Sequence, residues 1–321
     1  MLAAAIIAAL LAMPGRMPPL SKASSCDYGA KTNHITSFDD NPPFKGVVVL
    51  EDLGCPDLHR NRIRRYFHDD NDKLLAASSQ QPTITSSTST TNILSAIVTH
   101  LACNDAPVDT KEVAESIEFY LRSGKRAIGA AKRTLQNNGS IKQSMVIEDL
   151  CCGHGLTGML FAACNHPERL KTSMKVVLVD QSEPESHSIL RNLISDVCPW
   201  VNEATVNFVE SDLDGYTKSK QRHSSAEASI IISTHACGSL TDDVIKYAVQ
   251  SSAASVTVMP CCYTGTAKGS PFGVQRMYGV RETADIRRSF YLHENGYHVD
   301  FAAIPKAITP MNRLIVAERR S

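Results

Sequence analysis

The chain has 321 residues, of which 43% are hydrophobic and 21% charged, and its 33 basic side chains balance 33 acidic ones. This apolar fraction can build a core, so the composition excludes a wholly disordered chain. Zero net charge excludes a protein that binds polyanions over its whole surface, but it leaves a local basic patch open. Ten cysteines in 321 residues are too dilute for a small disulfide scaffold. We therefore expect reduced thiols and a cytoplasmic location.

The first 92 residues show no pattern of a folded domain. They begin with the apolar run MLAAAIIAALLAM, which is shorter than the roughly 20 residues that a membrane-spanning helix needs. The run has the length of the apolar part of a signal peptide, so organelle or secretory targeting through residues 1–16 is the alternative location. The stretch 78–92, SSQQPTITSSTSTTN, is typical of a linker. We predict a largely irregular region over 1–92 and one domain over 93–321.

In the second region, predicted strands alternate with predicted helices. The predicted strands are Met145–Leu150, Lys175–Asp180, Val206–Val209, Ser229–Ser233, Ser255–Met259, Val299–Ile304 and Leu314–Glu318. The predicted helices are Ile93–Leu101, one over 109–121, a second stretch with Lys125 to Arg133, Thr157–Cys164, Glu185–Val197, Thr241–Ser251 and Glu282–Glu294. Helices between successive strands predict a doubly wound, Rossmann-like α/β sheet of seven strands. Because no helix separates the last two strands, we expect the final strand to be antiparallel.

A glycine-rich segment joins the first predicted strand to the next helix. Gly153, Gly155 and Gly158 follow the pattern G-x-G-x-x-G. Glycine allows the backbone to turn tightly and to approach a ligand closely, and the helix that follows presents free N–H groups to an anion. The same residues also suit a tight turn without a ligand, so the motif alone does not establish a cofactor site.

Acidic residues follow the next two predicted strands. Asp180 ends an apolar strand, where a carboxylate can accept hydrogen bonds from both ribose hydroxyls of a nucleoside cofactor. Asp212 follows the third strand, where it can meet an adenine amino group. Gln181 and Leu213, directly after these acids, complete this part of the predicted site. The alternatives are a helix cap for Asp180 and an ordinary loop acid for Asp212.

Two cofactors fit this arrangement, a nicotinamide dinucleotide and S-adenosylmethionine. Asp149 lies in the approach to the glycine loop. A carboxylate there suits the ammonium group of S-adenosylmethionine and is unfavourable beside a pyrophosphate. A closing antiparallel strand also favours the methyltransferase architecture.

The segment DLCCGHG at residues 149–155 resembles motif I of class I S-adenosylmethionine-dependent methyltransferases, and Asp180 resembles their ribose-binding acid. Cys151 stands where many members have the first glycine of the loop. The resemblance implies that Asp149, Cys151, Gly153 and Gly155 bind the methionine end of the cofactor.

Three further motifs are more specific. Residues 233–243, 259–263 and 308–315 resemble the methyltransferase domain of glutathione S-transferase C-terminal domain-containing proteins. More distantly, they are similar to the eukaryotic tRNA 2′-O-methyltransferases that carry His-x-Cys-Gly and Cys-Cys motifs. The resemblance covers about residues 110–320 and does not extend to 1–92. The zinc-finger segments of the tRNA enzymes are missing, and Tyr263-Thr264 stands where those enzymes have His-His.

The predicted acceptor side lies after the fourth and fifth strands. His235 is the candidate base or substrate-orienting group, and the alternative is a histidine that holds the following turn. Tyr263 is expected to contact the acceptor. The predicted acceptor-pocket residues are Cys237, Pro260, Cys261 and Cys262. We predict no metal here, because zinc sites use spaced cysteines and adjacent side chains splay apart. Residues 264–281 are expected to form a mobile loop over this pocket.

The sequence therefore predicts a methyltransferase that uses S-adenosylmethionine, with RNA, a protein side chain or a small molecule as its acceptor. Basic residues between Lys125 and Arg133 are the candidate patch for RNA. The alternatives are an NAD(P)-dependent oxidoreductase that uses the same glycine loop and a non-catalytic scaffold with the methyltransferase fold. Neither a membrane span nor an oligomeric state is predicted.

Overall fold

The computed structural model describes residues 84–138, 144–220, 227–263, 265–266, 269–306 and 308–320. Most of the predicted irregular region, including the apolar run at residues 1–13, lies outside the described residues. In the part of the chain that is described, no helix is both long and apolar enough to cross a membrane.

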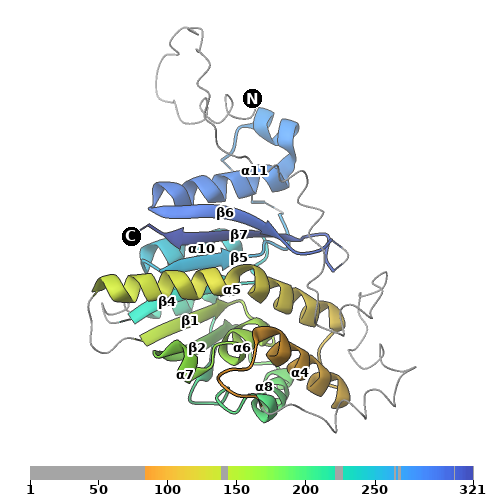
Figure 1. The fold of residues 1–321 in the computed structure, drawn as a ribbon. Coiled ribbons are helices and arrows are strands. Elements are labelled where there is room, and N and C mark those ends of the chain that lie inside the picture. The colour runs from red at the N-terminus through yellow and green to blue at the C-terminus, as the bar shows by residue number, and fades with distance from the viewer. Residues whose placement is uncertain are drawn as a thin grey trace, which may run out of the picture. The chain divides into compact units, whose positions relative to one another are not determined.

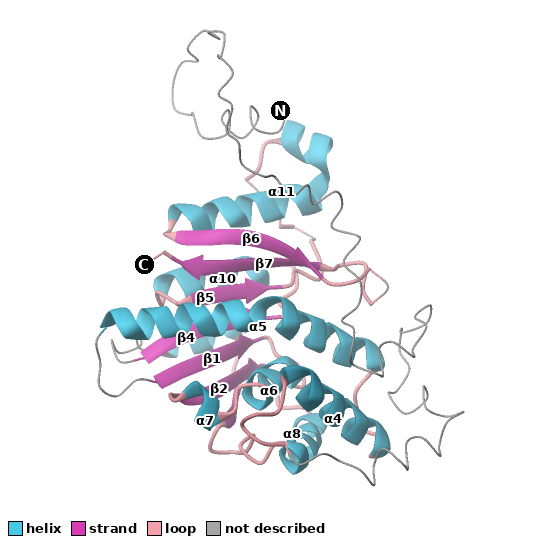
Figure 2. Ribbon diagram, in the orientation of Figure 1, coloured by secondary structure: helices cyan, strands magenta, loops and turns pink. Residues whose placement is uncertain are grey.

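The described strands form one mixed sheet of seven strands (Figures 1 and 2). They are β1 (Ser144–Leu150), β2 (Ser173–Asp180), β3 (Val206–Glu210), β4 (Glu227–Ser233), β5 (Ser255–Val258), β6 (Tyr297–Ala303) and β7 (Arg313–Arg319). Their order is β3-β2-β1-β4-β5-β7-β6, and β7 runs antiparallel to both of its neighbours, whereas the other pairs are parallel. The predicted Rossmann-like sheet with an antiparallel last strand is confirmed.

Helices cover both faces of the sheet. They are α4 (Thr90–Cys103), α5 (Thr110–Asn138), α6 (Leu156–Ala163), α7 (Pro167–Leu170), α8 (Glu185–Val197), α9 (Leu213–Ser219), α10 (Leu240–Gln250) and α11 (Phe272–Glu294). The two helical stretches predicted between 109 and 133 are one continuous helix, because the apolar stripe that begins at Val113 runs on to the buried Leu135. The sequence pattern missed α7 and α9, which are too short to show a helical period.

Alternate residues of each strand divide the core into two layers. In β4, Ile230 and Ile232 belong to the cluster that contains the buried residues of α4, α5, α6 and α8. Ile231 belongs to the other cluster, with buried residues of α9, α10 and α11. Successive side chains of a strand point to opposite faces, so the continuous apolar run of β4 fills both layers.

The predicted loop at 264–281 is partly wrong, because α11 begins at Phe272. Gly279 interrupts this helix with a φ of 84°, so the seven residues before it form a separate helical arm. The glycines and serine of this segment had favoured a loop. Phe272 and Met277 on the arm are exposed.

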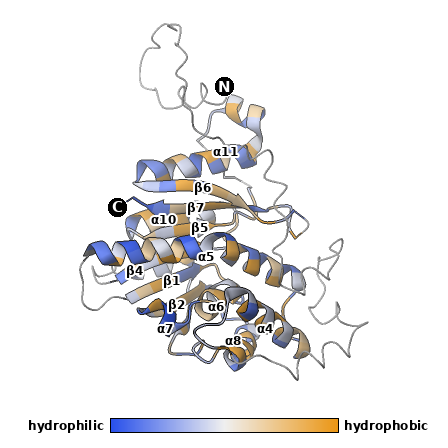
Figure 3. Cartoon of the chain, in the orientation of Figure 1, coloured by the Kyte–Doolittle hydropathy of each residue, from blue (hydrophilic) through white to orange (hydrophobic). Residues whose placement is uncertain are grey.

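The predicted basic patch is only partly available. Arg126 Nη1 lies 2.7 Å from Asp300 Oδ2, and Arg126 Nε lies 2.7 Å from Glu318 Oε1. Arg133 pairs with the second oxygen of Glu318. These ion pairs join the C-terminal half of α5, where hydrophilic residues are frequent (Figure 3), to β6 and β7. Two of the four basic residues of the patch therefore tether the helix to the sheet.

Candidate functional site

The glycine loop forms a left-handed turn between β1 and α6. Cys151, Gly153 and Gly155 have φ values of 57°, 55° and 78°. A Cβ on Gly155 would lie 2.5 Å from Leu178 Cδ1, so a side chain at this position would force the buried Leu178 to shift. Among the described residues, and apart from its chain neighbours, no atom lies within 4 Å of the place where a Cβ on Gly153 would stand, so the backbone there is open to a ligand. Cys151 thus occupies a left-handed position that favours glycine.

Asp180 connects the end of β2 to this loop. Its Oδ2 accepts a hydrogen bond of 2.7 Å from the Gly153 N–H, and its Oδ1 accepts one of 2.7 Å from the Gln181 N–H. The cap residue of α8 is Pro184, so the alternative that Asp180 caps this helix is wrong. The two backbone donors fix the carboxylate beside the open face of the loop.

A recess of about 270 Å³ lies at the carboxyl ends of these strands. It is lined by Cys151, Gly153, Val179, Asp180, Gln181, Ser211, Leu213, His235 and Leu240. A second recess, of about 360 Å³, shares Gln181, Leu213 and Leu240 with the first. Ligand pockets of proteins typically have volumes of about 300–1,000 Å³, so the two adjoining recesses give room for a nucleoside cofactor. The structure therefore brings together six of the residues that the sequence assigned to the site, and it adds Val179, Ser211 and Leu240.

Asp212 stabilises the start of α9. It is the N-cap residue of α9, and its Oδ1 accepts a hydrogen bond of 2.6 Å from the Gly215 N–H. Asp212 lines the second recess and not the first. The signal for this cap was present in the sequence, because Asp is a preferred N-cap residue, but the shortness of α9 hid it.

Asp149 is completely buried and lines neither recess. Its Oδ2 accepts a hydrogen bond of 2.9 Å from the Gly158 N–H, which belongs to the first turn of α6. Its Oδ1 has no hydrogen-bond partner among the described residues. Burial raises the pKa of this carboxyl to about 7, against the opposing effect of the Gly158 N–H.

His235 follows β4 and presents an exposed imidazole to the first recess. Although the imidazole is exposed, the surrounding protein atoms partly desolvate it, and this desolvation lowers the pKa of His235. The charged groups that act on it come from Lys111, Glu112 and Glu115 of α5 and from His154 of the glycine loop. The contribution of α5 to the site was not predictable, because no sequence motif links that helix to the strand ends.

Two of these neighbours form an ion pair beside the recess. His154 Nε2 lies 3.4 Å from Glu112 Oε2. Hydrogen bonding to Glu112 raises the pKa of His154, and the same contact lowers the pKa of Glu112. The pair connects the glycine loop to the first turn of α5.

Three predicted acceptor-pocket residues converge. The Sγ atoms of Cys237, Cys261 and Cys262 all lie within 4.8 Å of one another. Desolvation, followed by the contact with Cys261, raises the pKa of Cys237 to about 12. The premise that the adjacent cysteines splay apart is therefore wrong.

Tyr263 and Pro260 are buried. The Tyr263 hydroxyl donates a hydrogen bond of 2.9 Å to Asp285 Oδ2, and the ring lies 5.6 Å from the guanidinium carbon of Arg288. In the described structure the Tyr263 hydroxyl therefore holds the loop after β5 against α11.

Comparisons with known proteins agree with the chemistry of this site. Residues 125–268 match the family model of a methyltransferase domain, which spans β1 to β5 and includes the glycine loop, Asp180 and the three cysteines. Among curated protein sequences, none matches this chain. The family match confirms the prediction of a methyltransferase.

Solved methyltransferase structures are similar to the chain at low identity. A putative class I S-adenosylmethionine-dependent methyltransferase from Listeria monocytogenes is 11% identical, with a TM-score of 0.38 over 86% of this chain and 85% of that chain. A putative rRNA methylase from Clostridium thermocellum is 12% identical, with a TM-score of 0.37 over 61% and 96%. A phosphoethanolamine methyltransferase from Haemonchus contortus, in complex with S-adenosylhomocysteine, is 10% identical, with a TM-score of 0.32 over 60% and 53%. These TM-scores are too low to assign a substrate.

Proposed function

We propose that the recess between the glycine loop and the end of β2 is the S-adenosylmethionine site of this methyltransferase. The observation that carries the proposal is the contact between Asp180 and Gly153. There the Asp180 carboxylate accepts a hydrogen bond from the Gly153 N–H, and the backbone of Gly153 has space beside it for a ligand. The carboxylate oxygens keep further lone pairs, which can accept hydrogen bonds from the two ribose hydroxyls. The adjoining recess, which Asp212 and Leu213 line, then takes the adenine.

The methionine end of the cofactor belongs at the glycine loop. The free N–H groups at the start of α6 suit its carboxylate. Asp149, with one oxygen that has no described partner, suits its ammonium group. In this assignment, Cys151 and Gly155 shape the loop, and Gln181 lies beside the ribose.

The bound cofactor supplies a methyl group on a positively charged sulfur. Methyl transfer is an in-line displacement, so the protein mainly aligns the acceptor and excludes water. His235 borders the same recess, at the carboxyl edge of the sheet, and we assign it to orient the acceptor. Cys237, Pro260, Cys261 and Cys262 form the wall on that side, and Tyr263 holds this wall in place through Asp285.

The cofactor assignment is tested by the binding of S-adenosylhomocysteine to Asp180→Asn. The substitution removes the negative charge that accepts the ribose hydroxyls, so we expect a loss of affinity of roughly 10- to 100-fold in isothermal titration. The matched control is Asp196→Asn on α8, because Asp196 is exposed and pairs with His100 outside the recess. Tight NADH binding without S-adenosylhomocysteine binding would identify an oxidoreductase instead.

Two finer assignments rest on the sequence motifs. The segments at 233–243, 259–263 and 308–315 support a likeness to the methyltransferase domain of glutathione S-transferase C-terminal domain-containing proteins. A likeness to the tRNA 2′-O-methyltransferases has less support. Arg126 and Arg133 form ion pairs within the chain, and this reduces the basic patch that could bind RNA. All the cysteines among the described residues are unbridged, which supports a cytoplasmic location.

The acceptor is identified by transfer of a tritiated methyl group into fractionated cell extract. Label in the RNA, protein or small-molecule fraction names the class of acceptor. If wild-type protein transfers no label into any fraction although it binds S-adenosylhomocysteine, the chain is the non-catalytic scaffold.

A further inference from the structure

Three thiols that are far apart in the sequence meet at the carboxyl edge of the sheet. Cys237 follows β4, and Cys261 and Cys262 follow β5, yet their Sγ atoms lie within 4.8 Å of one another. Cys237 is exposed and the other two are half-buried. Packing of a hydrophobic core therefore does not explain why these side chains converge.

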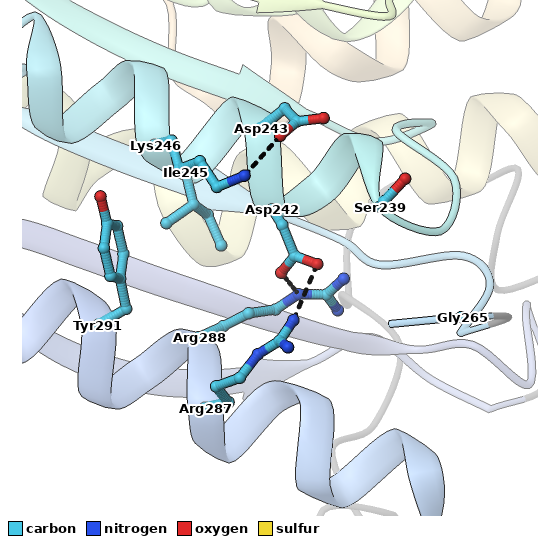
Figure 4. A pocket seen from close by; sticks show the side chains of 9 residues that line it. All are labelled: Ser239, Asp242, Asp243, Ile245, Lys246, Gly265, Arg287, Arg288 and Tyr291. Carbon is cyan, nitrogen blue, oxygen red and sulfur yellow. Dashed lines mark hydrogen bonds and ion pairs between the residues drawn. The ribbon is translucent and has the colours of Figure 1, made fainter. Parts of the chain in front are cut away.

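A buried arginine holds the two cysteine-bearing loops in place. Arg288 of α11 donates to the carbonyl oxygen of Gly238, the residue after Cys237, at 3.0 Å. It also donates to Asp285 at 3.2 Å, and Asp285 accepts a hydrogen bond from Tyr263, the residue after Cys262. A third contact of 2.9 Å joins Arg288 to Asp242 of α10 (Figure 4). One side chain thus fixes the loops on both sides of the thiol cluster.

We propose that Cys237, Cys261 and Cys262 form a binding site for Zn²⁺. Zinc–sulfur bonds of about 2.3 Å place the sulfurs of a tetrahedral site about 3.8 Å apart. The three Sγ atoms are already within 4.8 Å of one another, so side-chain rotations that move these atoms by about 1 Å complete the site without a change in the fold. Three thiolates from two clamped loops match the soft ligands that zinc prefers.

The site provides three ligands and leaves one position open. Among the described residues, no fourth histidine, cysteine or carboxylate atom joins the cluster. Structural zinc sites are closed by four protein ligands, whereas catalytic sites keep one position for water or substrate. The cluster lies on the acceptor side, because Cys237 is two residues from His235 in the same loop. We therefore assign the open position to water or to a donor atom of the methyl acceptor.

The test measures metal binding by the reduced, full-length protein after removal of metals with a chelator. Titration with Zn²⁺ against a chromogenic chelator should show one tightly bound ion per chain. Titration with Co²⁺ should produce a thiolate-to-metal charge-transfer band in the near ultraviolet. The variants Cys237→Ser, Cys261→Ser and Cys262→Ser should each bind zinc roughly 100-fold or more weakly, because loss of a direct ligand exceeds the 10- to 100-fold cost of an outer-shell partner.

The matched control is Cys103→Ser, which changes a half-buried thiol on α4 and should leave zinc binding unchanged. Circular dichroism of the metal-free variants shows whether the serine substitutions preserve the fold. The proposal is overturned if the folded wild-type protein binds no zinc, or if the three serine variants bind it as tightly as the wild type. A mass loss that indicates a disulfide within the trio, in protein purified without added reductant, would also overturn it. S-adenosylhomocysteine binding, measured in parallel, reports on the cofactor site independently.

Discussion

At the scale of single residues, Asp149 has an unusual environment. It is fully buried with one oxygen that has no described partner, and its pKa is raised to about 7. A positively charged ligand group nearby favours the ionised carboxylate and therefore lowers this pKa. Binding of the cofactor should accordingly be linked to the loss of a proton from Asp149 below pH 7.

This linkage predicts a pH-dependent affinity. S-adenosylhomocysteine, which carries the same ammonium group, should bind more tightly as the pH rises towards 7, by up to about 10-fold per pH unit, and this increase should level off above 7. Calorimetry at pH 6 in two buffers of different ionisation enthalpy should detect proton release. Asp149→Asn should bind more weakly and should lose this part of the pH dependence. Equal pH profiles for the wild type and the Asn variant would place the ammonium elsewhere.

Cys151 has a left-handed backbone conformation, which limits the side chains that this position tolerates. Its φ of 57° costs roughly 1–2 kcal/mol for a residue that has a Cβ, and a β-branched residue tolerates this region least. We expect the thermal midpoints of the variants to fall in the order Gly, Ala, Val. Thermal unfolding of the three variants tests this, and a Val variant as stable as the Gly variant would contradict the left-handed geometry.

At the scale of elements, the contact between α6 and β2 depends on a glycine. A Cβ on Gly158 would lie 2.5 Å from Leu178 Cδ2 and 3.0 Å from Val176 Cγ1. The third glycine of the motif therefore allows the helix to pack closely on the sheet, and the first two shape the loop. Because the glycines are needed for the turn and for helix packing even without a ligand, the motif by itself does not distinguish a tight turn from a cofactor site.

Gly158→Ala should destabilise the protein by about 1–3 kcal/mol, the usual cost of overpacking a core. The matched substitution is Gly129→Ala in α5, where, in the part of the chain that the structure describes, the new Cβ would meet only the end of the Arg133 side chain, at 3.5 Å. There the better helix propensity of alanine should raise the free energy of unfolding by about 0.5–1 kcal/mol. Chemical denaturation of both variants measures the contrast, and changes of the same sign would argue against close packing of α6.

At the scale of the whole molecule, Arg288 joins α10, α11 and the two acceptor-side loops. Its side chain is 1% exposed and pairs with Asp242 and Asp285. Arg313 of β7 also lies 2.9 Å from Asp285, so the network extends to the antiparallel strand. Removal of Arg288 breaks a buried ion pair with Asp285 and leaves Arg313 as the remaining cation beside that carboxylate, and the breaking of buried ion pairs is costly in a folded protein.

Arg288→Met should therefore lower the free energy of unfolding by about 3–5 kcal/mol. Arg287→Met is the matched control, because Arg287 pairs with the same Asp242 but is 38% exposed. Its effect should stay within about 1 kcal/mol. Urea denaturation distinguishes the two, and similar losses for both variants would show that Arg288 carries no special share of the network.

Much of the fold was predictable because apolar strands and amphipathic helices show their periods locally. The bounds predicted for α8 agree with the structure, and those of β1 and β2 differ by one or two residues. The two short helices and the arm at Phe272–Tyr278 were not predictable, because they show no helical period or contain glycine. At the site, Asp180 was recognisable from its place after a strand, whereas Glu112 and His154 form a pair only through the contact of α5 with the glycine loop.

The sequence by itself determined the alternation of strands and helices, the methyltransferase motifs and the carboxylate at the end of β2, because each depends on residues that are neighbours in the chain. Only the tertiary structure decided which side chains meet across loops. It buried Asp149, engaged the Tyr263 hydroxyl with Asp285 and gathered Cys237, Cys261 and Cys262. The reason is physical: the parallel sheet sets strands from distant parts of the chain side by side, so the residues after their carboxyl ends become neighbours whatever their separation in sequence.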